Sequence, residues 1–199
     1  MMYDIYLVGV GGQGILTIGS LIAEAAENKG LAVNFFPSKG MAQRGGFVKA
    51  QLRIGREEVG PNIPEKNADL VISMELSESL KAVRFCKPDG DFILFADIWA
   101  PTEVSLGKAA YPKLEEVQDK ILASGTHLHT LMPHQLPIFE GMIVQANLFL
   151  VGYAIQNTPL GSLLSADELE TFIVKKWAKE AEANLCAYHA GLKAENVHA

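Results

Sequence analysis

The stretch DIYLVGVGGQGILT, residues 4–17, decides the fold class, because it joins an apolar run directly to a glycine-rich turn and a helix-like segment. Residues 4–8 predict a buried strand, and residues 13–29 predict the helix that follows it. The glycines of the turn follow the spacing G-x-G-x-x-G. This spacing between a strand and a helix is typical of nucleotide-binding α/β proteins.

The glycine turn is the first candidate binding site, because its backbone can receive an anion. Gly9 permits a tight turn, Gly11 and Gly12 let a ligand approach the backbone, and Gly14 allows the helix to pack closely on the strand. The helix begins near Gln13 with unpaired N–H groups and the positive end of its dipole. The alternative is a turn that packs the helix and binds nothing.

Apolar runs and helix-like stretches alternate along the rest of the chain. We expect further strands at residues 31–36, 47–54, 68–73, 92–97 and 126–132. We expect further helices at residues 76–85, 113–124 and 138–155, and a last one from a capping box at Ser165 and Glu168 to about residue 190. The alternation predicts an α/β fold of three layers, in which a mostly parallel, Rossmann-like sheet has helices on both faces.

Two local patterns refine this expectation. In residues 47–54, apolar side chains alternate with Lys49, Gln51 and Arg53, which predicts a half-buried strand that is antiparallel or close to an edge. The sequence KPDG, residues 87–90, predicts a turn between a helix and a strand. No linker or repeat divides the chain, so we expect residues 1–199 to form a single domain.

Composition excludes several classes of protein. About half of the 199 residues are hydrophobic, no apolar run is long enough to cross a bilayer, and the first residues do not resemble a signal peptide. We therefore expect a cytoplasmic protein that acts away from membranes. The formal net charge of −6 argues against nucleic-acid binding. Cys86 and Cys186, both expected on helices as packed thiols, are too few for a disulfide framework, a four-cysteine cluster or a cysteine zinc site.

A dinucleotide site needs an acidic residue at the end of the second strand, where it binds the ribose hydroxyls. The corresponding segment, LAVNFFPSKG at residues 31–40, offers Asn34 but no carboxylate. NADP or coenzyme A fits this region better than NAD, because Ser38, Lys39 and Arg44 can bind phosphate groups.

The segment SKGMAQRGG, residues 38–46, is the second candidate site. Its glycines allow a close backbone approach, Arg44 can make paired hydrogen bonds to a carboxylate or phosphate, and Gln43 can both donate and accept. In a doubly wound sheet this loop lies beside the first glycine turn. A solvated turn with incidental charges is the alternative. The candidate residues are Ser38, Lys39, Gly40, Met41, Gln43, Arg44, Gly45 and Gly46.

Two other groups of residues are weaker candidates. His127 and His129 lie on one face of an expected strand and His134 follows, so a zinc site is conceivable, although ordinary strand and loop histidines are the favoured interpretation. Asp97 ends a strand at the edge where α/β proteins bind ligands. It is either a ligand contact or a residue that stabilises a turn.

Together, VGVGGQGILT at residues 8–17 and KGMAQRGGFVKAQLRIG at residues 39–55 resemble the gamma domain of the 2-oxoacid:ferredoxin oxidoreductases. The nearest likeness is to the small subunit of the indolepyruvate type. The resemblance covers nearly the whole chain and includes ADLVISMEL at residues 68–76. One departure is Lys39, where relatives of the indolepyruvate type often have histidine, and this leaves the particular 2-oxoacid open.

The resemblance implies oxidative decarboxylation of a 2-oxoacid to an acyl-coenzyme A, with electrons passed to ferredoxin. It also implies thiamine diphosphate, magnesium and iron–sulfur clusters. The chain has too few cysteines for a cluster, and PDGDF at residues 88–92 is only superficially similar to a diphosphate-binding motif. We therefore expect a non-autonomous subunit whose larger partner binds these cofactors. We assign this chain no metal and no catalytic base.

For the subunit itself, the resemblance implies a possible contact with coenzyme A through the two glycine segments. Two other functions stay open. One is a free-standing NADP-dependent dehydrogenase, and the other is a non-catalytic module that binds a nucleotide or coenzyme A.

Overall fold

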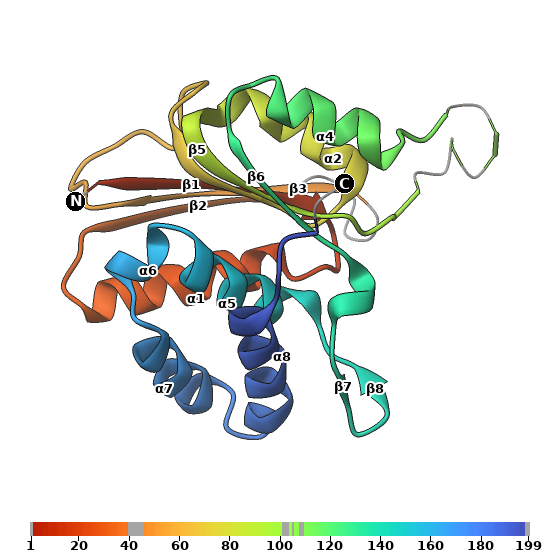
Figure 1. Ribbon diagram of the computed structural model, residues 1–199. Helices are drawn as coiled ribbons and strands as arrows, with labels where there is room; N and C mark the ends of the chain where they lie inside the picture. Colours follow the sequence, from red (N-terminus) through yellow and green to blue (C-terminus); the bar gives the residue numbers. More distant parts are fainter. Residues whose placement is uncertain (1, 40–45, 101–103, 105, 108–109, 198–199) are drawn as a thin grey trace.

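The computed structural model describes residues 2–39, 46–100, 104, 106–107 and 110–197. Its central sheet has the strand order β2-β3-β1-β4-β5-β6 (Figure 1). The strands are β1 (Tyr3–Val10), β2 (Val33–Lys39), β3 (Phe47–Ile54), β4 (Ala68–Ser73), β5 (Cys86–Phe95) and β6 (His127–Leu131). Strand β3 is antiparallel to β1 and β2, whereas β1, β4, β5 and β6 pair in parallel. The prediction of a mostly parallel sheet is confirmed.

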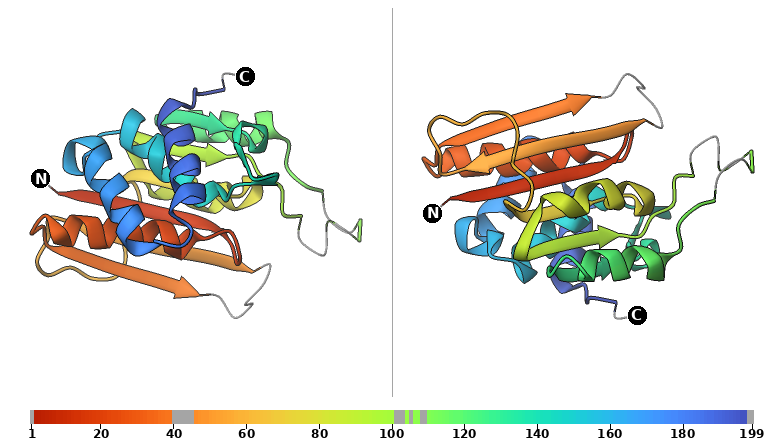
Figure 2. Two further views of the ribbon diagram at one scale, coloured as in Figure 1. Left: turned by 90° about the horizontal axis from the view of Figure 1, so that it is seen from below. Right: turned by 90° about the horizontal axis from the view of Figure 1, so that it is seen from above.

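Helices cover both faces of the sheet, which confirms the predicted three layers (Figures 1 and 2). One face carries α1 (Ile15–Asn28), α5 (Ala146–Asn157), α6 (Leu160–Leu163), α7 (Ala166–Lys176) and α8 (Ala181–Lys193). The other face carries α2 (Leu76–Ala82), the 3-10 turn η1 (Val83–Phe85) and α4 (Leu114–Leu122). No helix in the described part of the chain is long and apolar enough to cross a membrane.

Strand β1 lies at the centre because both of its faces are apolar. Ile5 and Leu7 point into the larger core beneath α1 and α5, whereas Tyr6 and Val8 point into the smaller core beneath α2 and α4. Side chains alternate between the two faces of a strand, so only a continuous apolar run can fill both cores.

Two predicted helices have different limits in the structure. Residues 138–143, predicted as helix, form the hairpin β7 (Ile138–Phe139) and β8 (Met142–Ile143), and α5 begins only at Ala146. Glu140 and Gly141 have positive φ angles of 48° and 80°, which a hairpin turn requires and a right-handed helix excludes.

The last predicted helix is divided in two. Its capping box is confirmed, since Ser165 and Glu168 exchange hydrogen bonds at the start of α7. Hydrogen bonds from the Ser165 backbone and from the Lys29 ammonium lower the pKa of Glu168 to about 2. Helix α7 ends before Trp177, whose φ of −125° and ψ of 53° are not helical, and the chain then turns back as α8.

The strand boundaries also needed correction. Strand β2 spans residues 33–39 rather than 31–36, and the predicted turn at residues 87–90 lies inside β5. There, Asp89 has a positive φ of 58° and the pairing with β4 shifts its register, so the residues form an irregular strand. Strand β3, in contrast, is antiparallel and lies next to the edge strand β2, as predicted.

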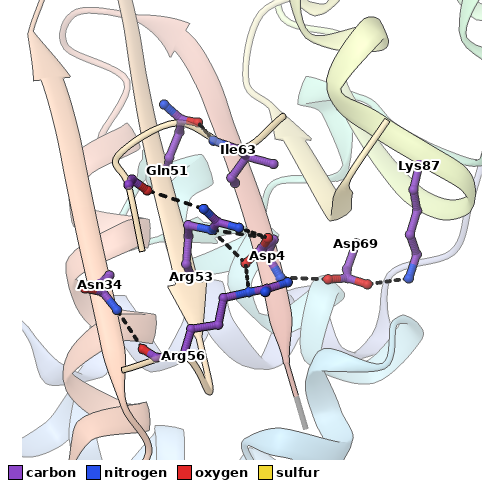
Figure 3. Close-up of polar contacts among 9 residues, drawn as sticks. Asp4, Asn34, Gln51, Arg53, Arg56, Ile63, Asp69 and Lys87 are labelled. Atoms are coloured by element: carbon purple, nitrogen blue, oxygen red, sulfur yellow. Dashed lines mark hydrogen bonds and ion pairs between the residues drawn. The ribbon is translucent and has the colours of Figure 1, made fainter. Parts of the chain in front are cut away.

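The polar face of β3 was expected to be half-exposed, yet Gln51 and Arg53 are buried. The connection formed by residues 55–67 covers this face. The Gln51 side-chain oxygen accepts a hydrogen bond from the Ile63 N–H at 2.6 Å, and Arg53 donates to the Gly60 carbonyl oxygen at 3.3 Å (Figure 3). Burial of these side chains follows from the path of the connection, which periodicity within the strand does not reveal.

Asp4 is the centre of an ion-pair network at the amino ends of the strands (Figure 3). The carboxylate of Asp4 is 1% exposed and accepts a hydrogen bond at 2.9 Å from Arg53, and Arg56 lies 3.5 Å away. The Asp4 backbone N–H donates to Asp69 at 2.7 Å, and Asp69 also pairs with Lys87. Strands β1, β3, β4 and β5 are thus joined by charged side chains at this end.

Asp4→Asn is expected to lower the free energy of unfolding by about 3 kcal/mol, because it leaves the buried Arg53 guanidinium without its counter-charge. Urea unfolding followed by circular dichroism measures this change. Asp89→Asn is the matched control, since Asp89 is exposed and asparagine tolerates its positive φ. Equal stability of the two variants would show that the network contributes nothing.

Candidate functional site

A cavity of about 220 Å³ lies at the carboxyl ends of β1, β4 and β5. In the strand order, β2 and β3 lie on one side of β1, and β4, β5 and β6 lie on the other. The strand order therefore reverses between β1 and β4, next to the cavity. Ligands of open α/β sheets bind at this point. The lining residues are Gly12, Gln13, Met74, Phe95, Asp97, Trp99, Pro133, Leu136, Gln145 and Ala146.

The glycine turn adopts a conformation that requires glycine. Gly12 and Gly14 have φ angles of 109° and 84°, in the left-handed region. A Cβ atom on Gly14 would lie 2.6 Å from the Asn147 side-chain nitrogen, and one on Gly9 would lie 2.6 Å from Ile15. The turn therefore brings α1 against β1 and against the start of α5 at distances that a larger residue would prevent.

Gln13 links the glycine turn to the neighbouring strand. Its side-chain oxygen accepts a hydrogen bond from the Val10 N–H at 2.8 Å, and its side-chain nitrogen donates to the Met74 carbonyl oxygen at 2.7 Å. The Gln13 and Gly11 backbone N–H groups donate to Val10 and to Gly46. Several N–H donors that could have bound a phosphate are thus engaged within the turn. Fewer donors are available to a ligand than the sequence suggested.

Asp97 gives the cavity a negative charge. One of its carboxylate oxygens accepts hydrogen bonds from the Gln13 side chain at 3.3 Å and from the Trp99 indole N–H at 2.8 Å, and the other accepts from the Ile98 N–H at 3.0 Å. Among the described residues, no cationic side chain forms an ion pair with it. Asp97 therefore stabilises the loop and also lines the cavity.

Glu75 anchors the backbone of Trp99, which lines the cavity. This fully buried carboxylate caps α2 by accepting hydrogen bonds from the Glu78 N–H at 2.8 Å and the Ser77 hydroxyl at 2.7 Å. Its other oxygen accepts from the Trp99 N–H at 3.3 Å and from the Tyr111 hydroxyl. Burial and the hydrogen bond to Glu75 raise the pKa of Tyr111 above its ordinary value, so the hydroxyl stays a donor.

The second glycine segment begins and ends beside the first one. Lys39 pairs with Val48 at the end of β2, and Val10 pairs with Phe47, so residues 40–46 connect two strands at the edge that holds the cavity. Gly46 accepts the hydrogen bond from Gly11 at 2.9 Å, and Ser38 is exposed. The candidate residues Gly40, Met41, Gln43, Arg44 and Gly45 lie outside the described residues.

Asn34 is not at the binding edge. Because β2 continues to Lys39, Asn34 lies near the opposite end of this strand and donates to the Arg56 carbonyl oxygen at 2.8 Å. In a dinucleotide site an acidic residue stands at the end of this strand. Here β2 ends at Lys39, which is basic.

The histidines are not gathered around a common point. His129 contacts Asp91 at 2.9 Å through one ring nitrogen and the Tyr153 hydroxyl at 3.1 Å through the other, so both nitrogens are engaged. His127 and His134 are exposed. Within the part of the chain that the structure describes, no three His, Cys, Asp or Glu side chains are arranged to hold a metal.

The cysteines behave as separate thiols. Cys86 is buried at the start of β5 rather than on a helix, and burial raises the pKa of its thiol to about 12. Cys186 is half-buried on α8, as expected for a packed thiol. The two thiols do not form a disulfide.

Glu75, Trp99 and Tyr111 were not among the site residues predicted from the sequence. A signal existed for Glu75, because it follows the strand at residues 68–73 as Asp97 follows the next strand, and strand ends meet at one edge. Tyr111 carried no such signal, since its contact with Glu75 spans 36 residues of sequence.

The fold and the site define an α/β protein with a cavity at the switch point of its sheet, and no three His, Cys, Asp or Glu side chains of the described residues are arranged to hold a metal. The chain matches the family Pyruvate ferredoxin/flavodoxin oxidoreductase over residues 4–194. It belongs to this family and is a subunit of a 2-oxoacid:ferredoxin oxidoreductase.

Similar proteins agree with this assignment. The indolepyruvate oxidoreductase subunit IorB of Thermococcus kodakarensis is 35% identical over 96% of this chain and 95% of its own length. Pyruvate oxidoreductase subunit PORC of Thermotoga maritima has the same fold, with a TM-score of 0.69, 22% identity and 96% of each chain covered. A 2-oxoglutarate:ferredoxin oxidoreductase chain of Magnetococcus marinus is similar over 96% of this chain but only 30% of its own length, with a TM-score of 0.61 and 19% identity.

Glu75→Gln is expected to lower the free energy of unfolding by about 2 kcal/mol, because a buried carboxylate that accepts four hydrogen bonds loses its charge. In a Trp177→Phe background Trp99 is the only tryptophan, so its emission should shift to the red as the loop loosens. Glu115→Gln, on the exposed surface of α4, serves as control. If Trp99 emission and stability stay unchanged, Glu75 does not hold the loop.

Proposed function

We propose that this chain is the non-autonomous small subunit of a thiamine diphosphate-dependent 2-oxoacid:ferredoxin oxidoreductase that acts on indolepyruvate or another aryl pyruvate. The similarity to IorB over nearly the full length of both chains supports the aryl substrate. The reaction we propose is oxidative decarboxylation to an acyl-coenzyme A, with electrons leaving to ferredoxin.

The main observation that supports a non-autonomous subunit is the small number of cysteines. An iron–sulfur cluster needs about four thiolate ligands, and this chain has two cysteines, one of them buried with a raised pKa. The residues present do not fit a cluster. We therefore assign the clusters, thiamine diphosphate and magnesium to a larger partner subunit.

The Magnetococcus relative supports a larger partner, because this chain corresponds to only 30% of that polypeptide. Exposed apolar side chains also support it. Ile138, Met142 and Ile143 of the β7–β8 hairpin are each more than 60% exposed, and Ile98 and Leu106, which follow β5, are exposed as well. An apolar surface of this kind around a site is typical of a face that contacts another protein.

For this chain we propose a positional role in which the two glycine segments, residues 9–14 and 38–46, contact coenzyme A. The solved Magnetococcus protein contains coenzyme A, which supports this ligand. Lys39 and Arg44 supply positive charge to balance phosphate groups, and the backbone of Gly12 offers close approach. Thiamine diphosphate, when bound on the partner, supplies the decarboxylation chemistry, and this chain orients the acyl acceptor.

Co-expression with a larger chain that contains clustered cysteines and a diphosphate motif tests the proposal. The two chains should purify as one brown, iron-containing complex that reduces ferredoxin with indolepyruvate and coenzyme A. The isolated small chain should have no such activity. Activity of the isolated chain with a 2-oxoacid would contradict the proposal.

The same preparation distinguishes the other functions. Micromolar binding of NADPH by the isolated chain would favour a free-standing dehydrogenase. A stable solitary chain that binds coenzyme A and never joins a larger subunit would favour a non-catalytic binding module.

Arg44→Ala is expected to reduce turnover of the assembled complex about tenfold, because one charge-assisted contact to a phosphate is lost. The free energy of unfolding should change little, since a loop arginine rarely supports the core. Steady-state kinetics at varied coenzyme A measures the effect, with Lys120→Ala on the exposed surface of α4 as control. Unchanged kinetics would remove Arg44 from the site.

A further inference from the structure

We propose that the cavity beside Gly12 binds a flat heteroaromatic ring that donates N–H hydrogen bonds, with Trp99 as its aromatic wall and Asp97 as its acceptor. This inference rests on the proposed function, which supplies two sources of such a ring. One is the adenine of coenzyme A, and the other is the indole of an aryl pyruvate.

Trp99 is an exposed aromatic side chain that the structure holds in one position. It is 44% exposed, yet its indole N–H donates to Asp97 at 2.8 Å and its backbone N–H donates to the buried Glu75 at 3.3 Å. Its ring also lies 3.8 Å from the position of a Cβ atom on Gly12. Because the ring is already ordered, a ligand that stacks on it loses little entropy in ordering the protein.

The cavity has the size and surface for one ring system. Met74, Phe95 and Leu136 give the cavity apolar lining in addition to Trp99, and Ala146, the first residue of α5, also lines it. The volume of about 220 Å³ is below the range of about 300–1,000 Å³ that encloses drug-sized ligands. A single bicyclic ring fits this space, whereas a complete nucleotide or coenzyme A molecule must extend beyond it.

The negative charge of Asp97 favours a ligand that donates an N–H hydrogen bond. A carboxylate offers about four positions for hydrogen bonds, and Asp97 uses three, for the Gln13 side chain, the Trp99 indole and the Ile98 backbone. The donors in the described part of the chain thus leave one acceptor position of Asp97. Among the residues that the structure describes, no lysine, arginine or histidine lines the cavity. A phosphate would meet an unbalanced negative charge here, so the anionic part of the ligand belongs outside the cavity.

The test uses the full chain labelled with ¹⁵N, because the indole N–H of Trp99 reports directly on the cavity. Trp99 and Trp177 give two indole signals, and a Trp177→Phe variant assigns them. Adenosine, indole and inorganic pyrophosphate are added in separate titrations. We expect a saturable shift of the Trp99 signal with adenosine or indole, and none with pyrophosphate.

The tighter of the two ring ligands identifies the source, coenzyme A for adenosine and the aryl pyruvate for indole. Absence of a saturable shift with both rings overturns the proposal, as does a shift with pyrophosphate alone. Success of the co-expression experiment together with such a result would overturn only this inference and leave the proposed function standing.

Methylated probes test the hydrogen bond without altering the protein. N6,N6-dimethyladenosine and 1-methylindole keep the ring and lose the N–H donors, so binding should weaken about tenfold relative to the parent compound. Asp97→Asn should weaken binding of the parent ring to a similar degree, and Asp89→Asn should not. Equal binding of the methylated and parent compounds would contradict the role of Asp97.

Discussion

The side-chain amide of Gln13 is the contact on which the candidate site depends. It accepts from Val10 at the end of β1 and donates to Met74 at the end of β4, so it bridges the point at which the strand order reverses. Asp97 accepts from the same amide, and Trp99 is held by Asp97 and by the buried Glu75. Because one side chain forms hydrogen bonds to the backbone of two strands, the residues that line the cavity around it have little freedom to move.

The charged side chains at the two ends of the sheet differ in whether they are paired. At the amino ends, Asp4, Arg53, Asp69 and Lys87 compensate one another in a partly buried network. At the carboxyl ends, Asp97 keeps an unused acceptor position and has no ion-pair partner among the described residues. Compensated charge stabilises a fold, whereas uncompensated charge at a cavity is available to a ligand.

These structural features are consistent with a subunit of a multi-subunit enzyme. The family places the chain in 2-oxoacid:ferredoxin oxidoreductases. The same fold fills 96% of the Thermotoga maritima PORC chain but only 30% of the Magnetococcus chain, so it occurs both as a separate chain and within a longer one. The cavity lies at one edge of the sheet, and large apolar side chains are exposed on the β7–β8 hairpin and at Ile98 and Leu106.

The sequence by itself determined β1, the glycine turn, α1 and the three-layer class, because an apolar run and glycines with required φ angles act locally. It also pointed to Asp97 and to the neighbourhood of the two glycine segments, since strand ends meet at one edge. Only the tertiary structure decided the burial of Arg53 beneath the 55–67 connection, the contact of Glu75 with Tyr111, and the cavity that Trp99 lines. These contacts join residues far apart in the chain, and periodicity within one segment contains no information about which distant segment covers it.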